Sequence, residues 1–313
     1  MVTTQEPLSD LLRYLKAADY RFITVTPATH AKVLARPATG PLSLRDIFGW
    51  NRLFAPPDIC PKVLELLRAA KAVETVDGLL RSKVRVATLG DDLLLHSAFP
   101  TDQPNCVFFG PDSYRFTRFL RERLPPLNGA RWLVDMGAGS GAGGIAASRG
   151  RVSDRVTLVD VNSQALKLAA INAEVAGIQA ETLVSDTVPA GADLIIANPP
   201  YMIDPAARTY RDGGRLWGGS VALDWVTQAL QRLTPGGTML LYSGAAHIEG
   251  KAPLLDALEL ACSDAGASMA VDEIDPDVFG DDLERAVYAR VERIAAVGII
   301  IRAKSASGPH SGA

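Results

Sequence analysis

Downstream of residue 130, short apolar runs alternate with helical patterns of about 10–15 residues. Strands joined in this way run parallel, so the pattern predicts an α/β fold whose sheet carries helices on both faces. Predicted strands cover 131–136, 155–161, 180–185, 192–197, 238–243, 268–274 and 294–302, and predicted helices cover 140–149, 163–176, 221–233 and 253–265. No full helix pattern separates the last two strands, which favours an antiparallel edge strand there. We therefore expect a doubly wound, mostly parallel, seven-stranded sheet.

The first 105 residues have a different character. Helical patterns cover 7–19, 28–35, 44–48 and 60–72, and a hairpin is predicted for 83–88 and 93–96. This suggests a small α+β module that recognises a substrate or partner, with a winged-helix type as one candidate. A helix over 114–123 is expected to lead into the main domain, and prolines and glycine at 124–129 mark a break. The predicted division is 1–105, 106–304 and a disordered tail, 305–313.

Composition narrows the function classes. A hydrophobic fraction of 48% and a charged fraction of 21% are ordinary for a globular protein, and no apolar run approaches the ~20 residues of a membrane span. The three cysteines, Cys60, Cys106 and Cys262, have no zinc or disulfide spacing. We expect a cytoplasmic protein without a secretory signal, membrane partner or metal.

Charge is distributed unevenly. The net charge is −3, which argues against strong general affinity for nucleic acid. Residues 1–128 hold 17 Lys and Arg against 13 Asp and Glu, whereas residues 129–313 hold 15 against 22. The basic front would suit RNA or an acidic partner, although random surface charge explains the difference equally well.

A glycine-rich turn joins the first predicted strand to the first helix of the main domain. It contains Gly137, Gly139 and Gly141. Glycines let the backbone approach a ligand, and the helix start offers unpaired N–H groups. Residues 139–144 also fit the dinucleotide pattern G-x-G-x-x-G, with Asp160 about twenty residues on. Asp135 favours S-adenosylmethionine (SAM) instead, because a carboxylate there attracts an ammonium group and repels a pyrophosphate.

The ends of the next two predicted strands supply further cofactor candidates. Asp160 ends the second strand, where a carboxylate can accept both ribose hydroxyls, and Val161 follows it. Asp186 ends the third and is placed to accept from an adenine amino group, helped by the Thr187 backbone. The alternative role of Asp186 is a helix or turn cap.

The tetrapeptide Asn198-Pro199-Pro200-Tyr201 follows the buried strand 192–197. It places one amide side chain and a restricted backbone at the carboxyl edge of the sheet, where open α/β sheets bind ligands. A simple proline-rich turn is the alternative. This motif has no role in NAD binding but a clear one in methyl transfer to nitrogen.

With these motifs, residues 108–302 resemble class I SAM-dependent methyltransferases, and within them the HemK-type and "small methyltransferase" group. That group includes release-factor glutamine N5-methyltransferases and several ribosomal RNA guanine N2-methyltransferases. The resemblance implies a Rossmann-like domain, SAM as cofactor and S-adenosylhomocysteine (SAH) as product. The segment 108–112 is similar to one that these enzymes place over the SAM pocket. Residues 1–105 match no module that we can identify, which leaves the acceptor open.

The resemblance also implies catalytic roles. Asn198 and the Pro199 carbonyl accept the two N–H groups of the acceptor nitrogen, and Tyr201 stacks on a planar acceptor group. Asn198 also borders the cofactor. Tyr210, Arg215 and Trp217 follow on the next loop, where they either contact the acceptor or pack as a lid. The acidic stretch 275–282 is either a solvated loop or the acceptor entrance.

Several acceptors are compatible with this sequence. The leading hypothesis is an N-methyltransferase for a protein glutamine side chain or a small amine or amide. A second is methylation of an exocyclic amine on an rRNA or DNA base, which the acidic main domain disfavours. Others are a biosynthetic methyltransferase acting on another heteroatom and a non-catalytic SAM-binding scaffold.

Overall fold

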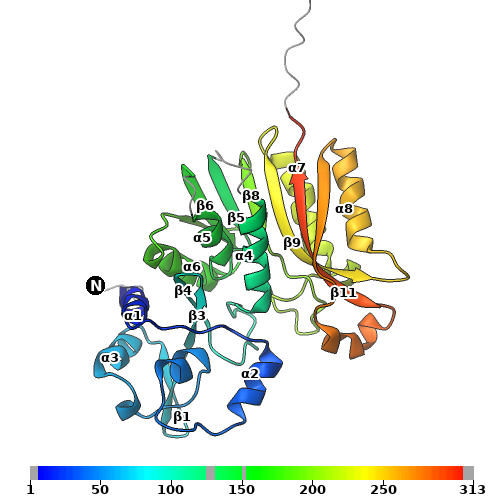
Figure 1. Cartoon of the computed structure of the whole chain (residues 1–313). Coiled ribbons are helices and arrows are strands. Elements are labelled where there is room, and N and C mark those ends of the chain that lie inside the picture. The colour runs from blue at the N-terminus through cyan, green and yellow to red at the C-terminus, as the bar shows by residue number, and fades with distance from the viewer. Residues whose placement is uncertain (1–5, 125–130, 150–152, 306–313) are drawn as a thin grey trace, which may run out of the picture.

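The computed structural model describes residues 6–124, 131–149 and 153–305 (Figure 1). The first part contains α1 (Glu6–Ala17), α2 (Pro27–Leu34), the π-helical η1 (Arg45–Gly49), η2 (Pro56–Asp58), α3 (Pro61–Ala69), β1 (Val73–Val76), β2 (Leu79–Ser82), β3 (Val84–Leu89) and β4 (Asp92–Ser97). The second begins with α4 (Pro111–Arg123), β5 (Trp132–Met136), α5 (Ala142–Ser148), β6 (Arg155–Asp160), α6 (Ser163–Val175), β7 (Glu181–Val184) and β8 (Leu194–Ala197). It continues with η4 (Leu216–Gly218), α7 (Ser220–Arg232), β9 (Thr238–His247), α8 (Pro253–Asp264), β10 (Ser268–Asp275), η5 (Gly280–Glu284), η6 (Ala286–Tyr288) and β11 (Arg293–Arg302).

The predicted sheet is present. Within the described ranges it has seven strands in the order β10-β11-β9-β8-β5-β6-β7, and the pairs from β9 to β7 are parallel. The antiparallel strand was expected at the edge, and this detail was wrong. The antiparallel β11 lies between β9 and β10 and pairs with β9 over ten residues, from Arg293 opposite His247 to Arg302 opposite Thr238. This long ladder is possible because β9 runs four residues beyond its predicted end at 243.

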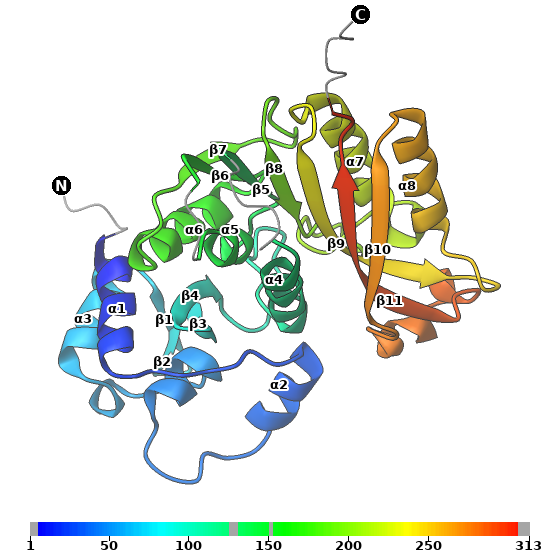
Figure 2. The ribbon, with the colours of Figure 1, turned by 45° about the horizontal axis from the view of Figure 1, so that its top comes forward.

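Helices cover both faces of the sheet, as the alternation predicted (Figures 1 and 2). Successive residues of a strand point to opposite faces. Leu133 of β5 accordingly belongs to the core beneath α4, α5 and α6, whereas its neighbour Val134 belongs to the core beneath α7 and α8. Both side chains are at most 1% exposed. The central strands are therefore buried on both faces, which explains their continuous apolar runs.

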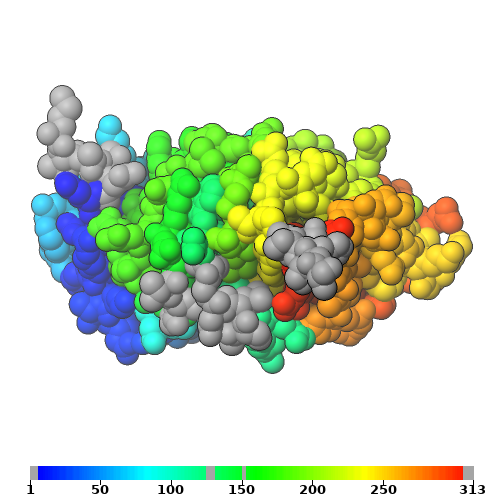
Figure 3. Space-filling view, turned by 90° about the horizontal axis from the view of Figure 1, so that it is seen from above, coloured from blue at the N-terminus to red at the C-terminus, as the bar shows by residue number. Residues whose placement is uncertain are grey.

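The N-terminal module packs on the helical layer and contains two hairpins (Figure 2). The β3–β4 hairpin was expected, and the β1–β2 hairpin was missed. Its two-residue turn, Asp77-Gly78, has positive φ at both positions (50° and 81°), the geometry that favours Asp-Gly in tight hairpins. That dipeptide was the available signal. In the space-filling view the module occupies one end of the molecule (Figure 3).

Helix α6 joins the module to the main domain. One of its faces packs towards the sheet, and its other apolar residues, Ala165, Leu168 and Ile171, enter the core of the module. The buried Asn172 side chain accepts from the Leu95 N–H (2.8 Å) and donates to the Leu95 carbonyl (3.0 Å), so it pairs with β4 as a strand would. The module is thus fixed to the helix that follows the second strand of the main domain.

The start of helix α6 and the two predicted irregular segments can be compared with the structure. Helix α6 begins as predicted at Ser163, but its cap is Asn162, whose side chain accepts from the N–H groups of Gln164 and Ala165. Asn162 itself holds the extended conformation that a cap requires (φ −89°, ψ 103°). The predicted break at 124–129 lies outside the described residues except for Leu124. The predicted tail lies outside them except for Ser305.

His30, Arg85 and two aromatic rings form a buried cluster in the module. The His30 ring is fully buried between the rings of Phe99 (4.2 Å) and Trp50 (5.3 Å). Its Nε2 is 2.9 Å from the Trp50 carbonyl and therefore carries the hydrogen, which leaves Nδ1 to accept from Arg85 (3.1 Å). Burial, together with the Arg85 guanidinium, lowers the pKa of His30 to about 4.

We expect this cluster to make the fold acid-sensitive. A histidine whose folded pKa lies below its unfolded value of about 6.5 stabilises the fold above pH 6.5, and this contribution is lost as pH falls towards 4. Between pH 7 and 5 the loss from His30 is about 1–2 kcal/mol. His30→Gln keeps a donor and an acceptor but cannot take up the proton. Thermal unfolding from pH 7.5 to 5 should therefore show a smaller decrease in Tm for His30→Gln than for wild type; equal slopes would contradict the assignment.

Candidate functional site

Strand pairing brings the two predicted motifs together. Met136, the last residue of β5, pairs with Ala197, the last residue of β8. The glycine turn and the tetrapeptide therefore leave the same edge of the sheet from neighbouring strands. The order of the strands reverses here, because β6 lies on one side of β5 and β8 on the other. The two motifs border a cavity of about 1020 Å³, which exceeds the usual size of a small-molecule site and leaves room for a cofactor and an acceptor.

The glycine turn forms the floor of the cavity. Gly137 has φ of +72°, and a Cβ there would lie 2.6 Å from the Trp225 ring of α7, so only glycine fits. Gly139 also has positive φ and donates its N–H to the Asp160 carboxylate (2.8 Å). Gly141 does not line the cavity; its backbone packs on Ala169 of α6 at the start of α5.

Asp135 lies beneath this turn at the cavity wall and is 1% exposed. Its carboxylate accepts from the Gly144 N–H (2.7 Å) at the start of α5. Burial, with a smaller contribution from Asp160, raises the pKa of Asp135 to about 7. A carboxylate in this state gains the most from a cationic ligand, because the ligand stabilises its ionised form.

The other predicted cofactor residues follow the neighbouring strands. The Asp160 carboxylate accepts from the N–H groups of Gly139 and Asn162 (both 2.8 Å), and Val161 beside it is 50% exposed and lines the cavity. Asp186 also lines the cavity and accepts from the Thr187 hydroxyl (2.9 Å). Thr187 is outside the lining, and its N–H donates to Ser185.

The tetrapeptide provides an unsatisfied acceptor. Asn198, Pro199 and Tyr201 all line the cavity. The Asn198 Oδ1 atom is buried, and no residue in the described ranges donates to it. A buried amide oxygen without a partner costs about 1–3 kcal/mol, so its presence at a cavity marks a position for a ligand donor.

Tyr201 is placed differently from its predicted role. Its side chain is 8% exposed, and its ring packs so closely on β9 that a Cβ at Gly244 would lie 2.4 Å from it. The ring also meets Phe279 edge-on at 5.9 Å. This packing leaves little free ring face for an acceptor.

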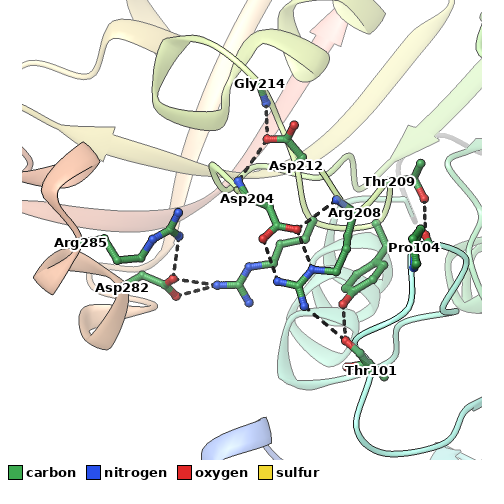
Figure 4. A network of polar contacts seen from close by, with 11 residues as sticks. Thr101, Pro104, Asp204, Arg208, Thr209, Asp212, Gly214, Asp282 and Arg285 are labelled. Carbon is green, nitrogen blue, oxygen red and sulfur yellow. Dashed lines mark hydrogen bonds and ion pairs between the residues drawn. The ribbon is translucent and has the colours of Figure 1, made fainter. Parts of the chain in front are cut away.

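The loop after the tetrapeptide is held from two sides (Figure 4). Asp204 forms a bidentate ion pair with Arg208 (2.6 and 2.8 Å), while the Tyr210 hydroxyl donates to the Thr101 carbonyl at the end of the N-terminal module (2.5 Å). On the other side, Arg211 pairs with Asp282 of η5 (2.8 Å). The N-terminal module thus shapes one wall of the site.

Aromatic side chains complete the cavity, and among them Trp225 was missed by sequence reasoning. Phe108 and Tyr210 line it with nearly parallel rings, 6.1 Å apart, and Trp225 lies under Gly137. Tyr210 was considered from its place in the sequence, whereas Arg215 and Trp217 are absent from the lining. Only tertiary packing distinguishes these side chains from ordinary core aromatics.

Part of the acidic stretch borders the cavity. Asp277, Asp281 and Asp282 border the cavity. Among the residues described, no cluster of three or more His, Cys, Asp or Glu side chains could hold a metal ion. No helix in the described ranges has the length and apolar character to cross a membrane.

The raised pKa of Asp135 gives a test of cofactor contact. If the cofactor presents its ammonium group to this carboxylate, binding requires the ionised form. SAH affinity should then rise up to about tenfold between pH 6 and 8 as the group with pKa about 7 loses its proton. Asp135→Asn should bind SAH more weakly, with a flatter pH profile in calorimetry. A wild-type profile that is already flat would argue against this contact.

This chain is similar to known methyltransferases over part of its length. Residues 106–259 match the family model described as Methyltransferase small domain. A release factor glutamine methyltransferase from Cereibacter sphaeroides is 30% identical over 175 residues, covering 51% of this chain and 59% of that protein. The ribosomal RNA small subunit methyltransferase C of Hahella chejuensis is 40% identical over 88 residues, covering 27% and 25%. The chain spans less than two thirds of the length of either relative. The family model covers just under half of the chain, and it supports the predicted methyltransferase domain.

Proposed function

We propose that this chain is a SAM-dependent N-methyltransferase of the HemK-type and small-methyltransferase group. Its acceptor is an amide or amino nitrogen, in a protein glutamine side chain or in a small amine or amide. The observation that carries the proposal is the buried, unpartnered Asn198 Oδ1 at the cavity wall. An N–H donor of the acceptor satisfies this oxygen.

The residues present fit the cofactor. Gly137 and Gly139 keep the floor free of side chains, Asp135 offers a carboxylate for the ammonium group, and Asp160 offers oxygens for ribose hydroxyls. Asp186 and Val161 border the space for the adenine. When bound, SAM supplies an electrophilic methyl group on a sulfonium ion.

The tetrapeptide orients the nitrogen. An amide nitrogen is a poor nucleophile because its lone pair is delocalised. The Asn198 oxygen accepts one N–H and the Pro199 carbonyl accepts the other, so the lone pair faces the cofactor side of the cavity. Catalysis then rests on position and electrostatics, because the two hydrogen-bonding oxygens belong to the protein and are held in place before the methyl acceptor binds.

The charge of the cavity favours a protein or small-molecule acceptor. In the described lining, nine aspartates face two arginines. Both arginines are already paired: Arg211 with Asp282, and Arg115 with Asp112 and Asp275. Phosphates require unpaired cations, so a nucleic-acid backbone gains little here.

A second candidate is methylation of a nucleic-acid base. It is favoured by the relatives named as ribosomal RNA methyltransferases, including methyltransferase G of Streptomyces griseus (33% identical over 121 residues, 32% of each chain). Under both candidates, we assign recognition of the acceptor to residues 1–105 and catalysis to residues 106–304.

Asn198→Ala tests the catalytic role. Removing one of two acceptors that act on the reacting nitrogen should reduce methyl transfer at least about 100-fold. SAH affinity should change little, because the glycine turn and Asp160 remain. Gln231→Ala, at an exposed amide side chain of α7 outside the lining, is the control. Near-normal transfer by Asn198→Ala would overturn the nitrogen mechanism.

The acceptor class is decided by labelling. Wild-type protein is incubated with methyl-labelled SAM and a host lysate that is then separated into protein, RNA, DNA and small molecules. We expect label in the protein or small-molecule fraction, absent with Asn198→Ala. Label that nuclease digestion releases would establish the second candidate instead.

A further inference from the structure

Three buried polar side chains meet behind the tetrapeptide. The Tyr242 hydroxyl of β9 donates to Asp112 Oδ1 at the start of α4 (2.8 Å). The Tyr201 ring meets the Tyr242 ring edge-on, with centroids 6.2 Å apart. Burial, together with the neighbouring Asp112 and Tyr242, raises the pKa of Tyr201. All three residues are at most 8% exposed, and Asp112 and Tyr201 border the cavity. They come from three segments that only the fold brings together.

The charge of Asp112 is compensated from its own helix. Arg115, one turn later, lies 3.3 Å from Asp112 and 2.9 Å from Asp275 of β10. Burial raises the pKa of Asp112, and the two tyrosines and Arg115 oppose this effect. A buried carboxylate is retained only where such partners offset its desolvation, so this arrangement is specific to the position.

The backbone after Tyr201 is fixed on the opposite side. Met202 donates its N–H to the Arg211 carbonyl (3.2 Å) and accepts from the Gly213 N–H (2.7 Å). The next residue, Ile203, donates to the Tyr288 hydroxyl (2.7 Å). Asn198 has no partner for its amide oxygen in the described structure. The direction of the Asn198 side chain therefore depends on how residues 199–203 are anchored.

We propose that Asp112 is a positioning residue for the tetrapeptide, acting through the hydroxyl of Tyr201. The carboxylate holds Tyr201 against β9, and this anchor keeps the Asn198 oxygen unpaired and directed into the cavity. The inference rests on the proposed function of Asn198. It assigns Tyr201 an anchoring role and leaves contact with a planar acceptor to Phe108 and Tyr210.

The test compares Asp112→Ala, Asp112→Asn, Tyr201→Phe and the double variant Asp112→Ala/Tyr201→Phe. Methyl transfer from labelled SAM to the acceptor fraction is measured at saturating SAM, and SAH affinity is measured by calorimetry. Asp193→Ala is the control, because Asp193 is a partly buried, hydrogen-bonded aspartate of the main domain that lies outside the cavity lining. Hydrogen exchange at residues 201–204 reports the anchor without any acceptor.

We expect Asp112→Ala to lower the rate about tenfold or more, with SAH affinity within about twofold of wild type and faster exchange at 201–204. Asp112→Asn should retain most of the rate, since its amide oxygen still accepts from the tyrosines. Tyr201→Phe should resemble Asp112→Ala, and the double variant should lose little more, because both changes break one anchor.

Three results would overturn the proposal. The first is a wild-type rate for Asp112→Ala. The second is an Asp112→Asn rate as low as that of Asp112→Ala, which would mean that the charge itself is required. The third is full additivity in the double variant. Asn198→Ala, assayed alongside, separates the two inferences: if it is inactive while Asp112→Ala is active, only the positioning role fails.

Discussion

The site depends on the pairing of β5 with β8 in the middle of the sheet. This pairing ends with Met136 opposite Ala197, so the glycine turn and the tetrapeptide begin at neighbouring points of one edge. Neither motif forms a site alone. The turn provides a floor without side chains beside the carboxylates of Asp135 and Asp160, and the tetrapeptide provides an unpartnered amide oxygen. A one-residue slip of β8 would turn its side chains to the other face and remove Asn198 from the cavity.

The N-terminal module belongs to this arrangement. It shares a core with α6, and its final segment supplies the Thr101 carbonyl that fixes Tyr210 in the loop after the tetrapeptide. On the far side, η5 fixes the same loop through Asp282 and Arg211. The end of the cavity beside Tyr210 and Asp282 is therefore built by segments far apart in the sequence, whereas the end beside the glycine turn is built by consecutive strand–turn–helix units.

Sequence patterns predicted the helices, strands and turns that are decided by interactions between residues close in the chain. Alternation of apolar runs and helical patterns identified the strands of the sheet, and the tight turn after β5 followed from its glycines. Sequence reasoning missed the β1–β2 hairpin because its strands are only four residues long and half-exposed, so their apolar pattern is weak. It also placed the antiparallel strand at the edge, because the order of β10 and β11 depends on which of them pairs with β9. Asp112 and Tyr242 gave no signal as partners, since 129 residues of chain separate them.

The sequence by itself determined the fold class and the two motifs, the glycine turn and the tetrapeptide, that border the cavity. These features follow from backbone geometry and from short motifs whose chemistry is local. Tertiary structure decided which other side chains line the cavity, among them the aromatic pair Phe108 and Tyr210 and the aspartates of the 275–282 stretch. These contacts are set by packing between distant segments, and the same packing gives the buried Asp112 its partners Tyr242 and Arg115.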